Sequence, residues 1–145
     1  MILRCSCGNA SLELTSAPLV RFLCHCTICQ AVYKAPYADA TIVARGAVRS
    51  LDHVDFKRHR SPPSLNRGTC NSCGEPVVGT LATLAFIPAR IFPQAELLPE
   101  PAMHIFYHSR VADVSDSLPK HSGYLASEWA VTKLAIRSLL TSRGP

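Results

Sequence analysis

The chain has 145 residues, of which 48% are hydrophobic and 17% charged, and this composition excludes an intrinsically disordered protein. The net charge of +5 is modest, and metal-bound thiolates would lower it further, so the charge does not favour a nucleic-acid partner. There is no signal-peptide pattern and no apolar run of membrane-spanning length. These features predict a cytoplasmic protein with reduced thiols and no membrane partner.

Most of the chain shows the short, alternating segments of a β protein. Proline and glycine separate these segments; Pro36, for example, excludes a helix that runs through it, and Gly46 marks a turn. One helical turn is expected over residues 25–31. The sequence predicts a mainly β fold with strands over residues 10–15, 19–24, 37–43, 47–51, 54–59, 76–79, 80–87 and 103–108.

The last part of the chain has a different pattern. Residues 123–143 lack proline and predict a helix of roughly four to five turns that starts near Ser122 or Ser127. We expect its apolar face to pack on the β core or on a second subunit, since its charges are too few for a membrane-surface helix. The sequence thus predicts a β domain over residues 1–121 and a helical extension over residues 122–145. The residues spaced three or four apart are Leu125, Trp129, Lys133, Ile136 and Leu140.

The seven cysteines fall into three groups. Two are pairs, each followed by a glycine (Gly8 or Gly74) that permits the tight turn needed to bring two thiolates to one metal. Paired cysteines at short spacing are the usual ligands of structural zinc, and they favour a four-sulfur site over ordinary buried thiols. The predicted structural zinc ligands are Cys5, Cys7, Cys70 and Cys73.

The third group, Cys24, Cys26 and Cys29, is an odd triplet. Three protein ligands leave the fourth position of zinc open, as in catalytic zinc sites, so the triplet is predicted to be catalytic. Two alternatives remain open at this stage. A histidine could close the site, and the candidates are His25, His53, His59 and His104. The Cys26–Cys29 spacing also permits a redox disulfide, although the βαβ pattern of thioredoxin-like proteins is absent.

Two basic features are candidates for binding an anionic substrate. Arg67 lies three residues before Cys70, so a metal site at Cys70 would fix its position, and we expect it to contact substrate. The run Lys57–Arg60 is expected to be a solvated strand end, with an anchor for a carboxylate or phosphate as the alternative.

The full cysteine frame resembles one known family. Cys5-x-Cys7-Gly8, Cys24-His25-Cys26-x-x-Cys29 and Arg67-x-x-Cys70-x-x-Cys73-Gly74 are similar to the motifs of the glutathione-dependent formaldehyde-activating enzyme (GFA, or CENP-V/GFA domain) family. The resemblance covers about residues 2–120, with His104-Ile105-Phe106 and Asp116-x-Leu118-Pro119 as closing segments. It implies a folded β-tent of short antiparallel sheets, similar to methionine sulfoxide reductase B, with two zinc ions per chain.

The resemblance also implies an activity. In the family the outer four cysteines hold structural zinc and the inner three hold catalytic zinc, and the named member forms S-hydroxymethylglutathione from formaldehyde and glutathione. The chain is therefore expected to be a carbon–sulfur lyase that takes a small thiol such as glutathione. The alternative is a zinc-stabilised module that binds a protein or nucleic acid without catalysis. The chain departs from the family pattern at Thr69, at Val111-Ala112-Asp113 and in the helix after Gly123.

Overall fold

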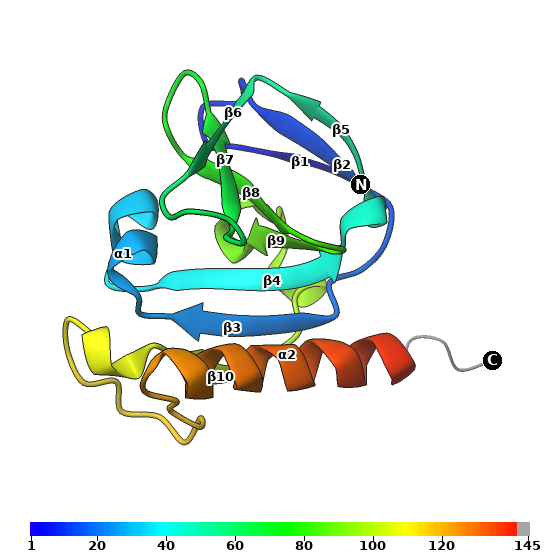
Figure 1. Cartoon of the computed structure of the whole chain (residues 1–145). Coiled ribbons are helices and arrows are strands. Elements are labelled where there is room, and N and C mark those ends of the chain that lie inside the picture. Colours follow the sequence, from blue (N-terminus) through cyan, green and yellow to red (C-terminus); the bar gives the residue numbers. More distant parts are fainter. Residues whose placement is uncertain (142–145) are drawn as a thin grey trace.

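The computed structural model describes residues 1–141 and consists mainly of β-strands in two sheets, with a long helix at the end (Figure 1). The strands of the smaller sheet have the order β1-β2-β5, and those of the larger sheet the order β10-β3-β4-β9-β8-β7-β6. The predicted fold class, mainly β with a C-terminal helix, is confirmed. The strands are β1 (Ile2–Arg4), β2 (Ser11–Leu14), β3 (Val20–Cys24), β4 (Ala38–Ala44), β5 (Val48–Asp52), β6 (Val54–Arg58), β7 (Asn66–Cys70), β8 (Pro76–Leu81), β9 (Leu84–Pro88) and β10 (Pro101–Ile105).

Helices connect and cover these strands. Helix α1 (Thr27–Tyr33) follows β3, and α2 (Tyr124–Thr141) runs along the large sheet beside β3 and β10 (Figure 1). Single 3-10 turns lie at η1 (Arg45–Ala47), η2 (Ala89–Ile91), η3 (Ala95–Leu97) and η4 (Tyr107–Ser109). No helix in the described part of the chain is long and apolar enough to span a membrane.

Strand β4 lies between two hydrophobic cores. Its pairing with β3 and β9 is antiparallel, and its neighbouring residues point to opposite faces of the sheet. Val43 belongs to the core between the two sheets, whereas Ile42 belongs to the core on the other face. Because both faces are covered, five of the seven residues of β4 are buried, and its one charged residue, Asp39, is only half-buried and pairs with Arg21.

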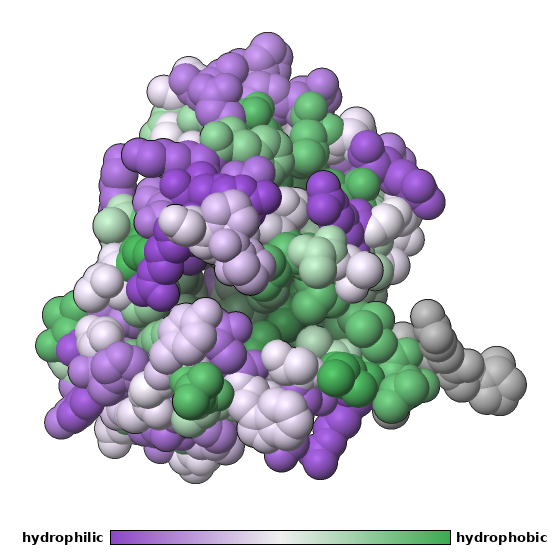
Figure 2. All heavy atoms as spheres, in the orientation of Figure 1, coloured by the Kyte–Doolittle hydropathy of each residue, from purple (hydrophilic) through white to green (hydrophobic). Residues whose placement is uncertain are grey.

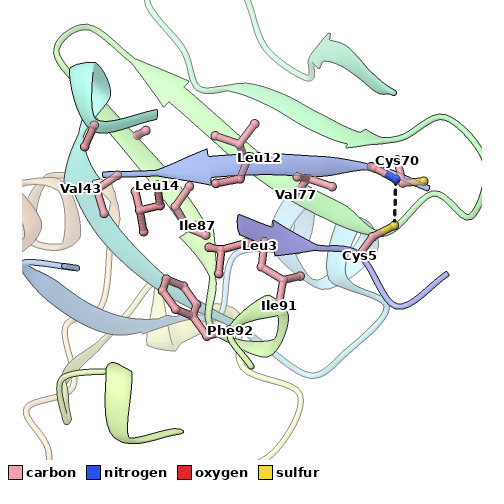
Figure 3. Close-up of a cluster of buried hydrophobic side chains, with 14 residues drawn as sticks. Leu3, Cys5, Leu12, Leu14, Val43, Cys70, Val77, Ile87, Ile91 and Phe92 are labelled. Carbon is pink, nitrogen blue, oxygen red and sulfur yellow. Dashed lines mark hydrogen bonds between the residues drawn. The ribbon is translucent and has the colours of Figure 1, made fainter. Parts of the chain in front are cut away.

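The first core joins the small sheet to the large one. Leu3 and Leu12 come from β1 and β2, and they pack against Val77 and Ile87 from β8 and β9 (Figure 3). These four side chains are almost completely buried. Burial of each contributes about 1.5–3 kcal/mol. The small sheet is therefore held against the large one by apolar packing as well as by the cysteines described below.

The second core holds α2 on the sheet. Ala135 is buried there, and Val131 and Leu134 pack against the same cluster. Ser127 fixes the first turn of the helix, because its Oγ accepts a hydrogen bond of 2.8 Å from the Phe106 N–H. The residues on which the helix was recognised, Leu125, Trp129, Ile136 and Leu140, are exposed in the single chain, and a different face of the helix packs on the sheet. The expectation that the apolar face packs on the β core or on a second subunit stays a prediction.

Several predicted boundaries differ from the structure. The predicted strands over residues 76–79 and 80–87 have a different boundary in the structure: β8 continues to Leu81, and the chain turns at Ala82, whose φ of 50° is unusual for a residue other than glycine. Strands β1 and β7 were not expected. The predicted end of the last helix, Arg143, lies outside the described residues, and the division of the chain after residue 121 stays a prediction, as does the likeness to methionine sulfoxide reductase B.

Candidate metal centres and the adjoining cavity

The four outer cysteines meet where two hairpins come together. Cys5 and Cys7 lie in the connection from β1 to β2, Cys70 ends β7, and Cys73 lies in the turn to β8. Their sulfur atoms all lie within 4.8 Å of one another. The Sγ–Sγ distance is 3.4 Å for Cys5 and Cys7, and 3.8 Å for Cys7 and Cys70. A tetrahedral zinc ion with Zn–S bonds of about 2.3 Å would space its sulfurs by about 3.8 Å, so this group could bind a metal ion.

Backbone N–H groups also point at these sulfurs. The Ala10 N–H donates to Cys5 Sγ over 3.2 Å, and the Ser72 N–H donates to Cys70 Sγ over 3.4 Å. Hydrogen bonds led by the Cys73 N–H lower the pKa of Cys70 to about 6. The glycines that follow each pair have φ of +79° and +74°, so they adopt the left-handed conformation expected of them. The loop thus favours the thiolate of Cys70 before any metal binds, whereas at Cys7 a hydrogen bond from the Asn9 backbone is outweighed by the neighbouring Cys5 and Cys73 thiols, which raise its pKa to about 12.

The inner triplet lies at the corner between β3 and α1. Cys24 ends the strand, Cys26 caps the helix, and Cys29 is in the first helical turn. All three are buried, and their sulfurs lie within 4.8 Å of one another. The Cys29 N–H donates to Cys26 Sγ over 3.3 Å, which is the cap hydrogen bond of α1. A helix start therefore gathers three sulfurs from six residues, and this second group could also bind a metal ion.

Negative charge is favoured on the middle cysteine of the triplet. Hydrogen bonds from the Cys24 and Cys29 thiols, the Cys29 N–H and the positive charge of Arg67 together lower the pKa of Cys26. The same hydrogen bonding and burial raise the pKa of Cys24. The triplet thus holds one thiolate readily, and a cation would be needed to hold three.

Arg67, which the sequence related only to Cys70, also lies next to the triplet. It comes from β7, three residues before the outer site, and its Nη2 is 3.7 Å from Cys29 Sγ. Its Nε is buried and has no hydrogen-bond partner among the described residues. A buried guanidinium N–H without an acceptor favours binding of an anion there.

The histidines do not join either sulfur group in the described part of the chain. His25 Nε2 is instead 2.8 Å from His104 Nδ1, and His104 Nε2 is 2.8 Å from an Asp116 carboxylate oxygen. Since Asp116 is an acceptor, His104 donates to it and accepts from His25. Burial, then the charges of His104 and Arg110, lower the pKa of His25 to about 4, so the ring is neutral. The structure therefore does not support a histidine as a fourth metal ligand at the triplet.

A cavity of about 440 Å³ opens beside the triplet, between α2, α1 and the β7–β8 region. Figure 2 shows a hollow on this side of the molecule, with apolar surface around it. Its charged lining residues are Arg60, Arg67 and Glu128. The apolar walls include Phe22, Ile28, Leu65, Phe86 and Val131. The sulfurs of the triplet thus face a largely apolar cavity that contains two arginines.

Sequence reasoning found the sulfurs and Arg67 but missed other parts of this region. In the run Lys57–Arg60, Arg60 lines the cavity, whereas the first three residues do not. Glu128, which also lines the cavity, was not among the predicted site residues. Asp116 was noted as a family motif, but its contact with His104 comes from a loop far along the chain, and no local pattern signals it. All seven cysteines are free thiols in the structure, with no disulfide.

The fold and the site define a class of protein: a mainly β chain with two cysteine groups able to bind metal, one of them open to a cavity. The model of the family described as glutathione-dependent formaldehyde-activating enzyme matches residues 1–109, and the chain belongs to this family. The match ends before α2. No curated protein matches the chain.

A solved structure also has a similar fold. It is the crystal structure of a Rhodobacter sphaeroides protein, with a TM-score of 0.53 and 16% sequence identity. The alignment covers 64% of this chain and 88% of the other. At this identity the similarity concerns the fold.

Proposed function

We propose that this protein is a zinc-dependent enzyme of the carbon–sulfur lyase type that acts on a thiol/aldehyde adduct such as S-hydroxymethylglutathione. The observation that carries the proposal is the convergence of three buried sulfurs and Arg67 on one cavity. Membership of the family supports the choice of substrate class.

In this proposal the cavity triplet (Cys24, Cys26 and Cys29) holds catalytic zinc, and the four outer cysteines hold structural zinc. When bound, the catalytic ion supplies Lewis acidity and favours the thiolate form of sulfur. The reaction joins a thiol sulfur to a carbonyl carbon, and the carbonyl oxygen takes up the proton lost by the thiol. The reverse reaction breaks the same C–S bond, and the sulfur keeps the bonding electron pair.

The chain's own residues would position the substrate. The free N–H of Arg67 would bind a substrate carboxylate, which places the thiol end near the triplet. Arg60 gives the cavity a second positive charge. The apolar walls exclude water from the reacting atoms, which strengthens the electrostatic interactions there.

Metal analysis tests the site assignment. The wild-type protein should contain two zinc ions per chain, the Cys26→Ser variant one, and neither result depends on knowing the substrate. If wild type and Cys26→Ser both contain one zinc ion, the second site is wrong.

The reaction is tested by NMR, with glutathione and formaldehyde as substrates and adduct formation measured above the uncatalysed rate. Arg67→Gln should raise KM about ten- to a hundredfold, as expected for loss of a charge-assisted hydrogen bond. Arg49→Gln is the matched control, because Arg49 lies on the small sheet and does not line the cavity. Absence of adduct formation with two zinc ions present, together with signal changes on titration with an oligonucleotide or a protein, would favour the binding-module alternative.

A further inference from the structure

A chain of contacts joins the four outer cysteines to the helix of the inner triplet, and it begins at Glu75. This residue closes the turn of the second cysteine pair, because the Cys70 N–H donates to the Glu75 carbonyl over 2.8 Å. The Glu75 carboxylate accepts a hydrogen bond from the N–H of Ser6, which lies between Cys5 and Cys7. Only 13% of the Glu75 side chain is exposed. Glu75 therefore contacts the backbone of both cysteine pairs.

Arg90 extends this chain of contacts to helix α1. It lies in η2, and its Nε is 3.1 Å from a carboxylate oxygen of Glu75. Its Nη1 donates to the Tyr33 carbonyl over 3.1 Å, and its guanidinium carbon lies over the Tyr33 ring, 5.4 Å from the centroid. One guanidinium thus binds both the carboxylate beside the outer cysteines and the last residue of α1.

Helix α1 depends on contacts at its two ends. It has only seven residues, and helices this short are not stable on their own. Its start is capped by Cys26, and its end is stabilised by the positive charge of Arg90, which binds a carbonyl that lacks a partner inside the helix. Tyr33 packs against the core cluster that contains the three triplet cysteines, and it lines the cavity. The position of α1, and with it that of Cys29, therefore depends on Arg90.

Arg67 is a second connection between the two sulfur groups. It lies in β7, three residues before Cys70, and its Nη2 is 3.7 Å from Cys29 Sγ. A metal ion at the outer cysteines would bond four sulfurs and so hold the two loops that Glu75 joins. It would thereby also hold Glu75 in reach of Arg90. Metal binding at the outer cysteines would in this way stabilise the arrangement of α1 that gathers the triplet.

We propose that Arg90 is a positioning residue that couples the two sulfur groups, so that metal binding at the outer cysteines raises the metal affinity of the triplet. Coupling between two binding sites is reciprocal, so metal at the triplet raises the affinity of the outer cysteines by the same factor. Such factors are typically about 5 to 150, and we expect about tenfold. The proposal rests on the part of the proposed function that assigns a metal ion to each sulfur group, and not on the reaction or the substrate.

The zinc affinity of the outer cysteines, measured by competition with a chelator, tests the proposal in four proteins. These are wild type, Cys26→Ser, Arg90→Gln and the double variant. Cys26→Ser empties the triplet, so its remaining zinc identifies the outer site. This substitution should lower the outer affinity about tenfold in the wild-type background, but by less than about twofold in the Arg90→Gln background. If Arg90 were only structural, Cys26→Ser would lower the outer affinity by the same factor in both backgrounds.

Two further variants complete the test. Glu75→Gln breaks the same chain of contacts from its other end and should give the result of Arg90→Gln. Arg21→Gln is the matched control: it removes a comparable pair, with Asp39 at 2.7 Å, between β3 and β4, so the effect of Cys26→Ser should stay about tenfold.

The three contrary outcomes are distinct. An unchanged outer affinity in Cys26→Ser, when wild type holds two zinc ions, would overturn the coupling and leave the metal assignment standing. An equal loss in the wild-type and Arg90→Gln backgrounds would overturn the role of Arg90. A wild-type protein with a single zinc ion would overturn both this proposal and the assignment of metal to the triplet.

Discussion

Gly68 is a position at which one added methyl group should disturb the packing of the large sheet. It lies in β7 between β6 and β8, opposite Phe56 and Val78. A Cβ at this position would lie 2.6 Å from Val54 Cγ1, 3.0 Å from Phe56 Cε1 and 3.1 Å from Val78 Cγ1. Carbon atoms pack best at about 3.5–4.0 Å, so the side chains of the neighbouring strands would have to shift.

Gly68→Ala should therefore cost about 1–3 kcal/mol in overpacking, offset by about 0.4–1 kcal/mol from the stiffer unfolded chain. Gly46→Ala is the matched control: no atom lies within 4 Å of its added Cβ, and the residue has no positive φ. That variant should gain about 0.4–1 kcal/mol. Urea unfolding followed by circular dichroism, at equal zinc content, measures both. The reasoning is refuted if Gly68→Ala is as stable as wild type, or if Gly46→Ala is destabilised equally.

Three other outcomes are expected. Cys73→Ser should remove one zinc ion per chain by metal analysis and lower the melting temperature strongly, because structural zinc sites contribute on the order of 10 kcal/mol to folding. The hydrogen bond with Lys120, and then the one with His104, lowers the pKa of Asp116 from 3.8 to about 2. The ionised Asp116 carboxylate therefore stabilises the fold above pH 3.8, and this stabilisation is lost as the pH falls through about 2. The stability difference between wild type and Asp116→Asn, measured by urea midpoint, should accordingly shrink over that range and not at pH 6–8. Ser127→Ala removes the side-chain acceptor of the partly buried Phe106 N–H and should cost about 0.5–1.5 kcal/mol in the same unfolding assay.

The sulfur groups could be predicted from sequence because their geometry is set by spacing. Cys5 and Cys7 are two residues apart, and Cys24 to Cys29 lie around the start of one helix, so local turns bring the sulfurs together. The pairing of distant groups was also predictable, since four is the ligand number of structural zinc. Arg67 was chosen as a candidate because it lies three residues before Cys70 in the sequence. The residues within each cysteine pair and within the triplet are close in sequence, whereas the fold brings the two pairs together.

Features set by tertiary contacts were not predictable in this way. Strand β7 contains an asparagine and a glycine, and its extended form comes from pairing with β6 and β8 on both sides. The face by which α2 packs on the sheet could not be read from its largest residues, because Ser127, Val131, Leu134 and Ala135 make the contact while Leu125, Trp129, Ile136 and Leu140 are exposed. The Asp116 contact depends on a loop that returns to β10 through the hydrogen bond from the His104 N–H to the Pro119 carbonyl.

The parallel pairing of β10 with β3 has a consequence for the order in which the chain can fold. Synthesis delivers the N-terminal strands first, so β3 and its cysteine cluster exist long before residues 101–105 are available. During that interval one edge of β3 has no neighbour, and exposed strand edges are sites of aggregation. The last strand therefore completes the sheet and covers the segment that leads into the triplet, through the hydrogen bond from the His25 N–H to the Ile105 carbonyl. Until Ile105 has been synthesised, the edge of β3 that leads into the triplet stays exposed. Because β10 completes the surroundings of the triplet, we expect the triplet to bind metal late in folding.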